Sequence, residues 1–87
     1  MIYNANISIV SMIFVVSLSG RNVVLDVEPS STVLELKGRI HTVIGISPPE
    51  QRLIFLGKQL QDAHNLHDCG ISRDSTIHLT MRLRGGF

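Results

Sequence analysis

The chain has 87 residues, a length that fits one domain with a small core. Its formal charge is +1, from 8 basic and 7 acidic residues, which argues against nucleic acid or an anionic membrane as the main partner. Aromatic residues make up only 5% and tryptophan is absent, so a stacking platform for single strands is also disfavoured. Because Cys69 is the single cysteine, stability has to come from packing and not from disulfides.

The N-terminal segment has two interpretations. The run from Ile7 to Leu18 has the length of a signal-peptide core, and Ser17 to Ser19 resembles a small-x-small cleavage site. However, the residues before the run contain no Lys or Arg, and cleavage would remove a predicted strand. We therefore expect residues 1–11 to form a short flexible or strand-extending leader.

Two β-branched runs, Ile13 to Leu18 and Val23 to Val27, flank a turn that contains Gly20. This arrangement predicts an antiparallel hairpin. Side chains of a strand alternate between its two faces, so one face is predicted to join the core and the other to point away from it. The predicted core face carries Ile13, Val15, Val23, Leu25 and Val27, and the opposite face carries Phe14, Val24, Asp26 and Glu28.

A helix is predicted to begin after Pro29, because Thr32 and Glu35 have capping-box spacing. Its apolar stripe consists of Val33, Leu36, Ile40 and either Val43 or Ile44. Gly45, followed by Pro48 and Pro49, predicts its end. Lys37 lies beside the stripe, where a lysine is usually exposed, although Asp62 as a partner would allow partial burial.

The rest of the chain predicts three more strands. Arg52 to Leu56 and Lys58 to Leu60 flank Gly57, and the long run from Ser75 to Leu83 alternates. Its inward residues are predicted to be Ile77, Leu79 and Met81, and Leu66 and Ile71 are predicted to anchor the polar segment 61–74. Strands on both sides of one helix indicate an α+β fold, with the first and last strands side by side at the sheet centre.

Several segments carry a resemblance that needs no insertion or deletion from Ser11 to Gly86. In chain order they are Ile13-Phe14-Val15, Leu25 to Ser30, Gln51 to Phe55, Gly57 to Leu60, Gln61-Asp62, Ser75 to Leu79 and Arg82 to Gly86. Over these segments the chain resembles the ubiquitin family. The resemblance implies a β-grasp fold, a five-stranded mixed sheet packed on one helix, with residues 12–81 as the domain and 82–87 as a flexible conjugation tail.

The resemblance also implies a protein modifier joined through Gly86 to lysines of target proteins. Gly85 would let the tail enter narrow enzyme clefts, and a protease would first have to remove Phe87. The expected partners are activating, conjugating and ligase enzymes, that protease and ubiquitin-binding domains. We expect the protein to be a monomer in the cytoplasm and nucleus. We expect it not to be an enzyme and to have no catalytic residue, cofactor or metal. Nucleic acid and membranes are not expected as partners.

Arg82 and Arg84 are the residues that the resemblance assigns to recognition by the activating enzyme. At the position of Arg82, ubiquitin has an arginine and its relative Nedd8 has a small residue. A guanidinium offers fixed, planar donors that a small side chain cannot imitate. Arg82 therefore favours the ubiquitin machinery over that of Nedd8.

The resemblance predicts three apolar recognition surfaces, against the alternative of scattered surface residues. The Ile54 patch consists of Leu18, Ile54, His78 and Thr80, rimmed by Arg52 and Gly57. The Ile46 patch consists of Ile46, Met81 and Leu83, and the Phe14 patch of Met12, Phe14 and Val24. Thr80 replaces a valine of the family, and its hydroxyl should weaken binding by about 1 kcal/mol.

The chain has two lysines, Lys37 and Lys58, for building chains. By resemblance, Lys58 matches the lysine used for degradative chains and Lys37 matches a largely buried one. The other family lysines are replaced by residues without a nucleophilic amine, namely Val16, Arg21, Arg39, Val43 and Arg73. If chains form, we expect them to form at Lys58.

His64, His67 and Cys69 have a spacing that could gather ligands for zinc, with Asp68 as the nearby fourth group. An ordinary polar loop with a small, half-buried thiol is the simpler interpretation, and a catalytic cysteine lacks an accompanying signature. By resemblance, Cys69 replaces a tyrosine that braces this loop. A second function class also stays open: a ubiquitin-fold interaction module that is never conjugated, which the lost lysines and Thr80 favour.

Overall fold

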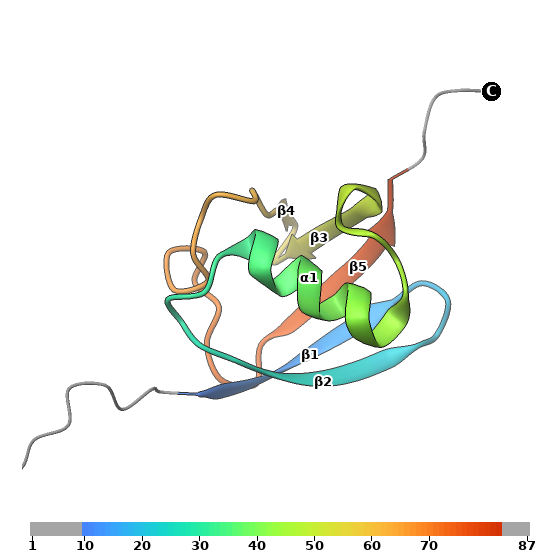
Figure 1. Cartoon of the computed structure of the whole chain (residues 1–87). Helices are drawn as coiled ribbons and strands as arrows, with labels where there is room; N and C mark the ends of the chain where they lie inside the picture. Colours follow the sequence, from blue (N-terminus) through green and yellow to red (C-terminus); the bar gives the residue numbers. More distant parts are fainter. Residues whose placement is uncertain (1–9, 83–87) are drawn as a thin grey trace, which may run out of the picture.

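The strands form one mixed sheet in the order β2-β1-β5-β3-β4 (Figure 1). A computed structural model describes residues 10–82 of the chain. The elements are β1 (Ser11–Ser17), β2 (Asn22–Val27), α1 (Val33–Ile44), the short 3-10 helix η1 (Pro48–Glu50), β3 (Gln51–Phe55), β4 (Lys58–Gln59) and β5 (Thr76–Met81). Five strands with one packed helix confirm the expected β-grasp fold.

Some predictions concern residues outside the described range 10–82. These are the flexibility of residues 1–9 and every role assigned to Leu83, Arg84, Gly85, Gly86 and Phe87. At the N-terminal side, β1 begins at Ser11, one residue before the expected start of the domain.

The predicted hairpin is present as β1 and β2, with Ile13 opposite Leu25 and Val15 opposite Val23. The predicted inward residues of the hairpin are buried, except Val23, which is half-buried against the core. β1 ends at Ser17, one residue earlier than expected, so Leu18 lies in the turn and is 85% exposed.

β1 and β5 pair in parallel, with Val15 beside Ile77 and Ser17 beside Leu79. The predicted contact between the first and last strands is therefore confirmed. A parallel pair needs a long connection between its strands, and here α1, β3 and β4 lie within it. β3 pairs with β5 on the other side, so β5 runs through the middle of the sheet.

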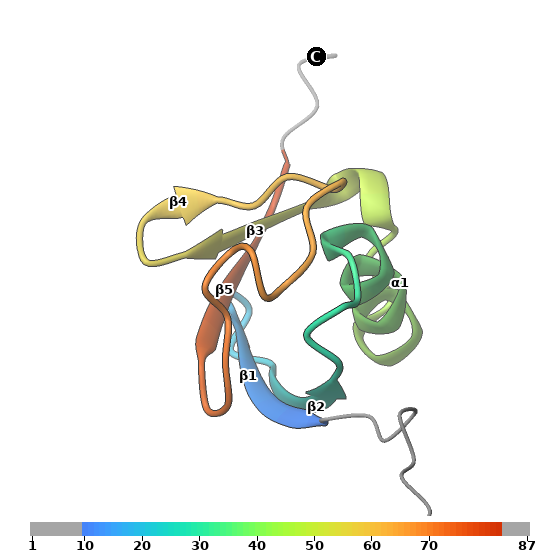
Figure 2. The ribbon, with the colours of Figure 1, turned by 90° about the vertical axis from the view of Figure 1, so that its left-hand side faces the viewer.

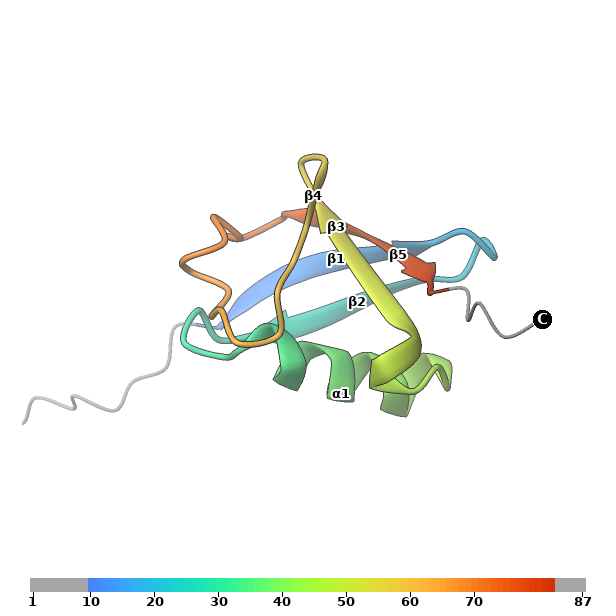
Figure 3. The ribbon, with the colours of Figure 1, turned by 90° about the horizontal axis from the view of Figure 1, so that it is seen from above.

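α1 begins at the predicted capping box: the Glu35 backbone N–H donates to the Thr32 hydroxyl, and the Thr32 N–H donates to the Glu35 carboxylate. It ends at Gly45, whose φ of 93° is left-handed and suits glycine. Figures 2 and 3 show α1 lying across one face of the sheet, which we call the inner face. Of the two alternatives for the last stripe position, Ile44 packs against the core and Val43 is exposed.

Two polar side chains are buried with the core. Lys37 is only 5% exposed, and its Nζ lies 2.6 Å from Oδ1 of Asp62, as the sequence allowed. Gln51 is fully buried, and its Nε2 donates to the carbonyls of Lys37 and Ile46, each at 2.8 Å. These bonds tie β3 to the helix and to the segment that follows it. The predicted anchors Leu66 and Ile71 are also buried.

One inward prediction is wrong. Met81 was expected to join the core with Ile77 and Leu79, which are buried, but it is 54% exposed. The register explains the difference: β1 accompanies β5 only as far as the pair Ser17 and Leu79. Met81 therefore extends past the end of its neighbour and loses the cover that the two preceding inward residues have.

Candidate binding surface and acceptor lysine

The outer face of the sheet brings together most of the predicted Ile54 patch. Ile54 on β3 lies opposite His78 on β5, and His78 lies beside Val16 on β1. Arg52 lies opposite Thr80 in the same antiparallel pair. Directly opposed residues share a face and contact each other, so these side chains form one surface.

Burial within the Ile54 patch differs from residue to residue. Ile54 and Thr80 are half-buried, whereas Arg52, His78 and Gly57 are exposed. A half-buried aliphatic side chain within a polar, exposed surround has the anatomy of an interface centre with its rim.

Leu18 joins this surface from the β1–β2 turn, and it also connects two of the predicted patches. Leu18 and Thr80 line a hollow of about 340 Å³ together with Ile46 and Met81. The described members of the Ile46 patch therefore adjoin the Ile54 patch. Met81 is exposed and is therefore accessible to a partner, and its place in a recognition surface stays a prediction.

Thr80 is the departure from the family within the patch, and its hydroxyl has only a weak partner. The Oγ1 atom donates to the carbonyl of Arg52 at 3.5 Å, longer than a normal hydrogen bond. A partner that covers Thr80 would thus desolvate a poorly satisfied hydroxyl.

The Phe14 patch occupies the same outer face nearer to β2. Phe14 lies opposite Val24, and both are exposed, as is Met12. Val16 is half-buried and lies two residues along β1 from Phe14. On its other side it lies beside His78 of β5, a member of the Ile54 patch. In the sequence analysis, Val16 appeared only as a residue that replaces a family lysine. Strand alternation places it on this face, but its position between the two patches was not predicted.

The two lysines have opposite environments. Lys37 is buried and paired with Asp62, whereas Lys58 is exposed on β4, at the edge of the sheet. The turn before Lys58 consists of Leu56 and Gly57, whose φ values of 51° and 80° are both positive, as in the tight turns that join twisted strands. This turn presents the Lys58 amine at the edge of the molecule.

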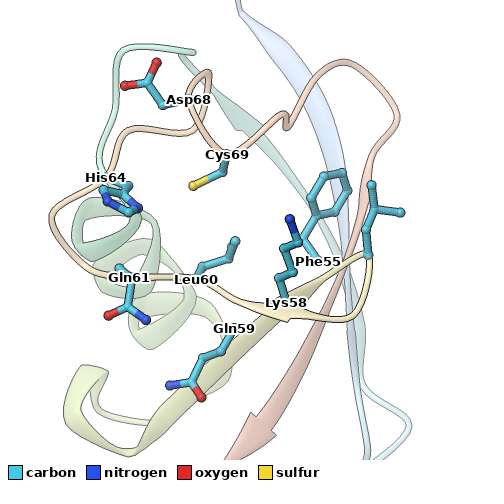
Figure 4. Close-up of a pocket in the computed structure, with 9 residues that line it drawn as sticks. Phe55, Lys58, Gln59, Leu60, Gln61, His64, Asp68 and Cys69 are labelled. Atoms are coloured by element: carbon cyan, nitrogen blue, oxygen red, sulfur yellow. The ribbon is translucent and has the colours of Figure 1, made fainter.

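A hollow of about 320 Å³ lies directly beside Lys58 (Figure 4). We call it the Lys58 hollow. Its lining includes Phe55, Leu56, Lys58, Leu60, Asp68 and Cys69. The sequence reading missed this hollow, because its walls come from β3, β4 and the segment 61–74, whose packing no local pattern predicts.

Cys69 in this hollow is a half-buried, free thiol. Burial, with a smaller contribution from the Asp68 carboxylate, raises the pKa of the Cys69 thiol. A raised pKa lowers the fraction of the nucleophilic thiolate at neutral pH, which is the reverse of what a catalytic cysteine needs.

The segment around Cys69 is held by local hydrogen bonds. The Cys69 N–H is shared between the carbonyls of Asn65 and Leu66, and the Asp68 N–H donates to Oδ1 of Asn65 at 2.9 Å. Among residues 10–82, no three His, Cys, Asp or Glu side chains gather closely enough to hold a metal ion, so the arrangement of His64, His67 and Cys69 does not support the zinc alternative.

Arg82 lies where β5 ends, with its side chain exposed. Its backbone N–H donates to the carbonyl of Glu50 at 2.7 Å. This bond holds the start of the predicted tail against η1. In the described part of the chain, no helix has the length and hydropathy required to cross a membrane.

Comparison with known proteins gives the family. The model of the ubiquitin family matches residues 13–84. Ubiquitin-like protein 1 of Schizosaccharomyces pombe is 39% identical over 75 residues, covering 86% of this chain and 96% of the relative. NEDD8 of Dictyostelium discoideum is 37% identical over 75 residues, covering 86% and 97%, and the NEDD8-like protein RUB3 of Arabidopsis thaliana is 35% identical over 70 residues, covering 80% and 90%. The chain therefore belongs to the ubiquitin family and is a ubiquitin-like modifier.

Proposed function

We propose that this modifier is conjugated through Gly86 to lysines of target proteins after a protease removes Phe87, and that partners recognise it through the Ile54 patch. The observation that carries the proposal is at the end of β5. Arg82 is exposed and its backbone is held there, and the sequence Leu83-Arg84-Gly85-Gly86 follows directly. The tail thus starts from a fixed point beside the exposed recognition surfaces.

The chemistry needs little from the modifier itself. An activating enzyme would adenylate the Gly86 carboxylate with ATP and release pyrophosphate, and a cysteine thiolate of that enzyme would then displace AMP to form a thioester. The lysine amine of a target then attacks the carbonyl carbon: a C–N bond forms, the C–S bond breaks, the thiol leaves and the amine proton passes to a base. Because the enzymes supply every catalytic group, the modifier has no catalytic activity of its own in this proposal.

The expected acceptor for a second copy is Lys58. Its amine is exposed, whereas the amine of Lys37 is buried against Asp62. Withdrawing Lys37 for reaction would leave the Asp62 carboxylate without its partner and would open the core. Self-conjugation through lysine is therefore expected at Lys58 alone.

The choice of activating enzyme is a part of the proposal. Relatives of the chain are named NEDD8 or NEDD8-like. Arg82, by contrast, favours the ubiquitin-activating enzyme, because its exposed guanidinium offers several fixed donors. We propose charging by the ubiquitin-activating enzyme, in the cytoplasm and nucleus, of a monomeric modifier.

A thioester assay tests these points. The full-length chain and a version ending at Gly86 are each mixed with ATP and either the ubiquitin-activating or the NEDD8-activating enzyme. The expected result is an adduct sensitive to reducing agent, formed by the shortened version with the ubiquitin enzyme. An adduct with the NEDD8 enzyme alone would contradict the role of Arg82, and an adduct from the full-length chain would contradict the need to remove Phe87.

A ubiquitin-fold interaction module that is never conjugated is the second candidate. Two observations favour it: the hydroxyl of Thr80 in the Ile54 patch, and the small number of lysines. Absence of an adduct from either version with either enzyme would support this candidate. Binding measurements on the Ile54 patch would then be the next experiment.

A further inference from the structure

We propose that the Lys58 hollow receives the C-terminal tail of a second copy of this chain once that copy is attached to Lys58. Leu83 of the attached copy would pack against the apolar wall of the hollow. This inference rests on the proposed function, because it concerns the product of conjugation at Lys58.

The hollow has the position and the size for such a tail. Figure 4 shows the side chains of Leu60 and Cys69 in the middle of the hollow, with Phe55 and Lys58 on one side and His64 on the other. Its volume of about 320 Å³ is at the lower end of ligand pockets, which begin near roughly 300 Å³. It therefore offers room for one or two side chains of a peptide and not for a helix.

Leu56 provides an exposed apolar side chain at one edge of the hollow. It is 83% exposed and has a φ of 51°, a left-handed conformation that leucine rarely adopts. This conformation belongs to the tight turn with Gly57, and the turn holds the apolar side chain in solvent two residues before the acceptor lysine. Leu83 of an attached tail is a suitable apolar partner.

The covalent bond itself favours this occupant over others. When the tail is extended, Gly85 and Gly86 place the Cα atom of Arg84 about 10 Å and that of Leu83 about 13 Å from the Lys58 amine, and a bend at the glycines brings both closer. The two glycines add no side chains that would block the approach. Since the tail is tethered beside the hollow, its effective concentration there is of the order of millimolar or higher, and even a weak contact is populated.

The test uses the full chain with Lys58 modified by chemical synthesis, so that no enzyme is required. One form carries Leu-Arg-Gly-Gly in isopeptide linkage, and the matched control carries Gly-Gly alone. Cys69 is the single cysteine, so its alkylation rate with iodoacetamide reports access to the hollow. We expect alkylation to be slower by about threefold or more with the longer peptide, because a millimolar effective concentration populates weak contacts.

Two further forms test the proposal. Ser-Arg-Gly-Gly in place of Leu-Arg-Gly-Gly should abolish most of the protection. A pair of full chains linked at Lys58, with Cys69→Ser in the attached copy, should show the same protection as the peptide.

Equal alkylation rates with Leu-Arg-Gly-Gly and Gly-Gly would overturn the proposal. Protection that appears only when a conjugating enzyme is added would also overturn it, since the occupant would then be that enzyme. Because the linkage is made synthetically, these results do not depend on whether any activating enzyme charges the chain. Failure of this inference and failure of the proposed function are thus separate outcomes.

Discussion

The two faces of the sheet are built from the same strands and both carry apolar side chains, yet they serve different purposes. Leu53 on the inner face of β3 is fully buried beneath α1, whereas its neighbour Ile54 on the outer face is half-buried. No described element covers the outer face (Figure 3). Cover, and not composition, therefore decides which apolar residues stabilise the domain and which are available to a partner.

The lysines repeat this contrast. Lys37 lies within the helix–sheet layer and is held by Asp62, and Lys58 lies at the open edge of the sheet. The first amine contributes to the fold and the second is available for chemistry. Four predictions test the contrast between covered and open positions.

The largest effect is expected from one pair of neighbours. Leu53→Ala should lower the free energy of unfolding by about 3 kcal/mol, because it leaves a cavity under α1. Ile54→Ala should cost less than about 1 kcal/mol in stability but should weaken binding of a ubiquitin-binding domain by about tenfold or more. Urea unfolding and titration calorimetry measure the two effects. Equal losses of stability would contradict the assignment of the two faces.

Asp62→Asn should lower the free energy of unfolding by about 2 kcal/mol, because the buried Lys37 ammonium loses its counter-charge. The expected loss is smaller than for a fully buried pair, since Asp62 is 53% exposed and water screens it. Lys37→Met is the matched control and should stay within about 1 kcal/mol of the parent, because no charge then remains buried. A larger loss in Lys37→Met than in Asp62→Asn would show that the ammonium makes further contacts.

Lys58→Arg should leave stability unchanged and reduce the formation of self-chains by about tenfold or more, because a guanidinium stays protonated and does not form the isopeptide bond. Attachment of a single copy to a lysine of another protein should continue and provides the internal control. Gel analysis of a reconstituted conjugation reaction measures both products. Abundant chains in the variant would contradict the assignment of Lys58.

The smallest effect is expected at Thr80. Thr80→Val removes a weakly satisfied hydroxyl from the Ile54 patch and should tighten binding of a ubiquitin-binding domain by about 1 kcal/mol, roughly fivefold. Thr76→Val, the same change on the same strand opposite Phe14, is the control and should alter affinity little. Similar gains from both variants would indicate a general effect of outer-face hydrophobicity.

Local patterns in the sequence were sufficient for the elements themselves. Strand alternation placed Ile13 and Val15 inside, and the capping box of Thr32 and Glu35 located the start of α1. These predictions succeed because they depend on backbone geometry within a few residues. The order of the elements predicted the α+β class and the contact between the first and last strands, and the resemblance to the ubiquitin family supplied the five-stranded mixed sheet and the residues of the patches.

Three properties depended on contacts between distant segments. Met81 is exposed because β1 ends before reaching it, Val16 joins the Ile54 and Phe14 patches because β5 lies beside β1, and the Lys58 hollow exists because the segment 61–74 packs beside β4. The sequence by itself determined the periodicity and the caps, and it contains the diglycine on which the proposed conjugation rests. Only the tertiary structure decided which side chains are covered, because cover depends on where a neighbouring element begins and ends.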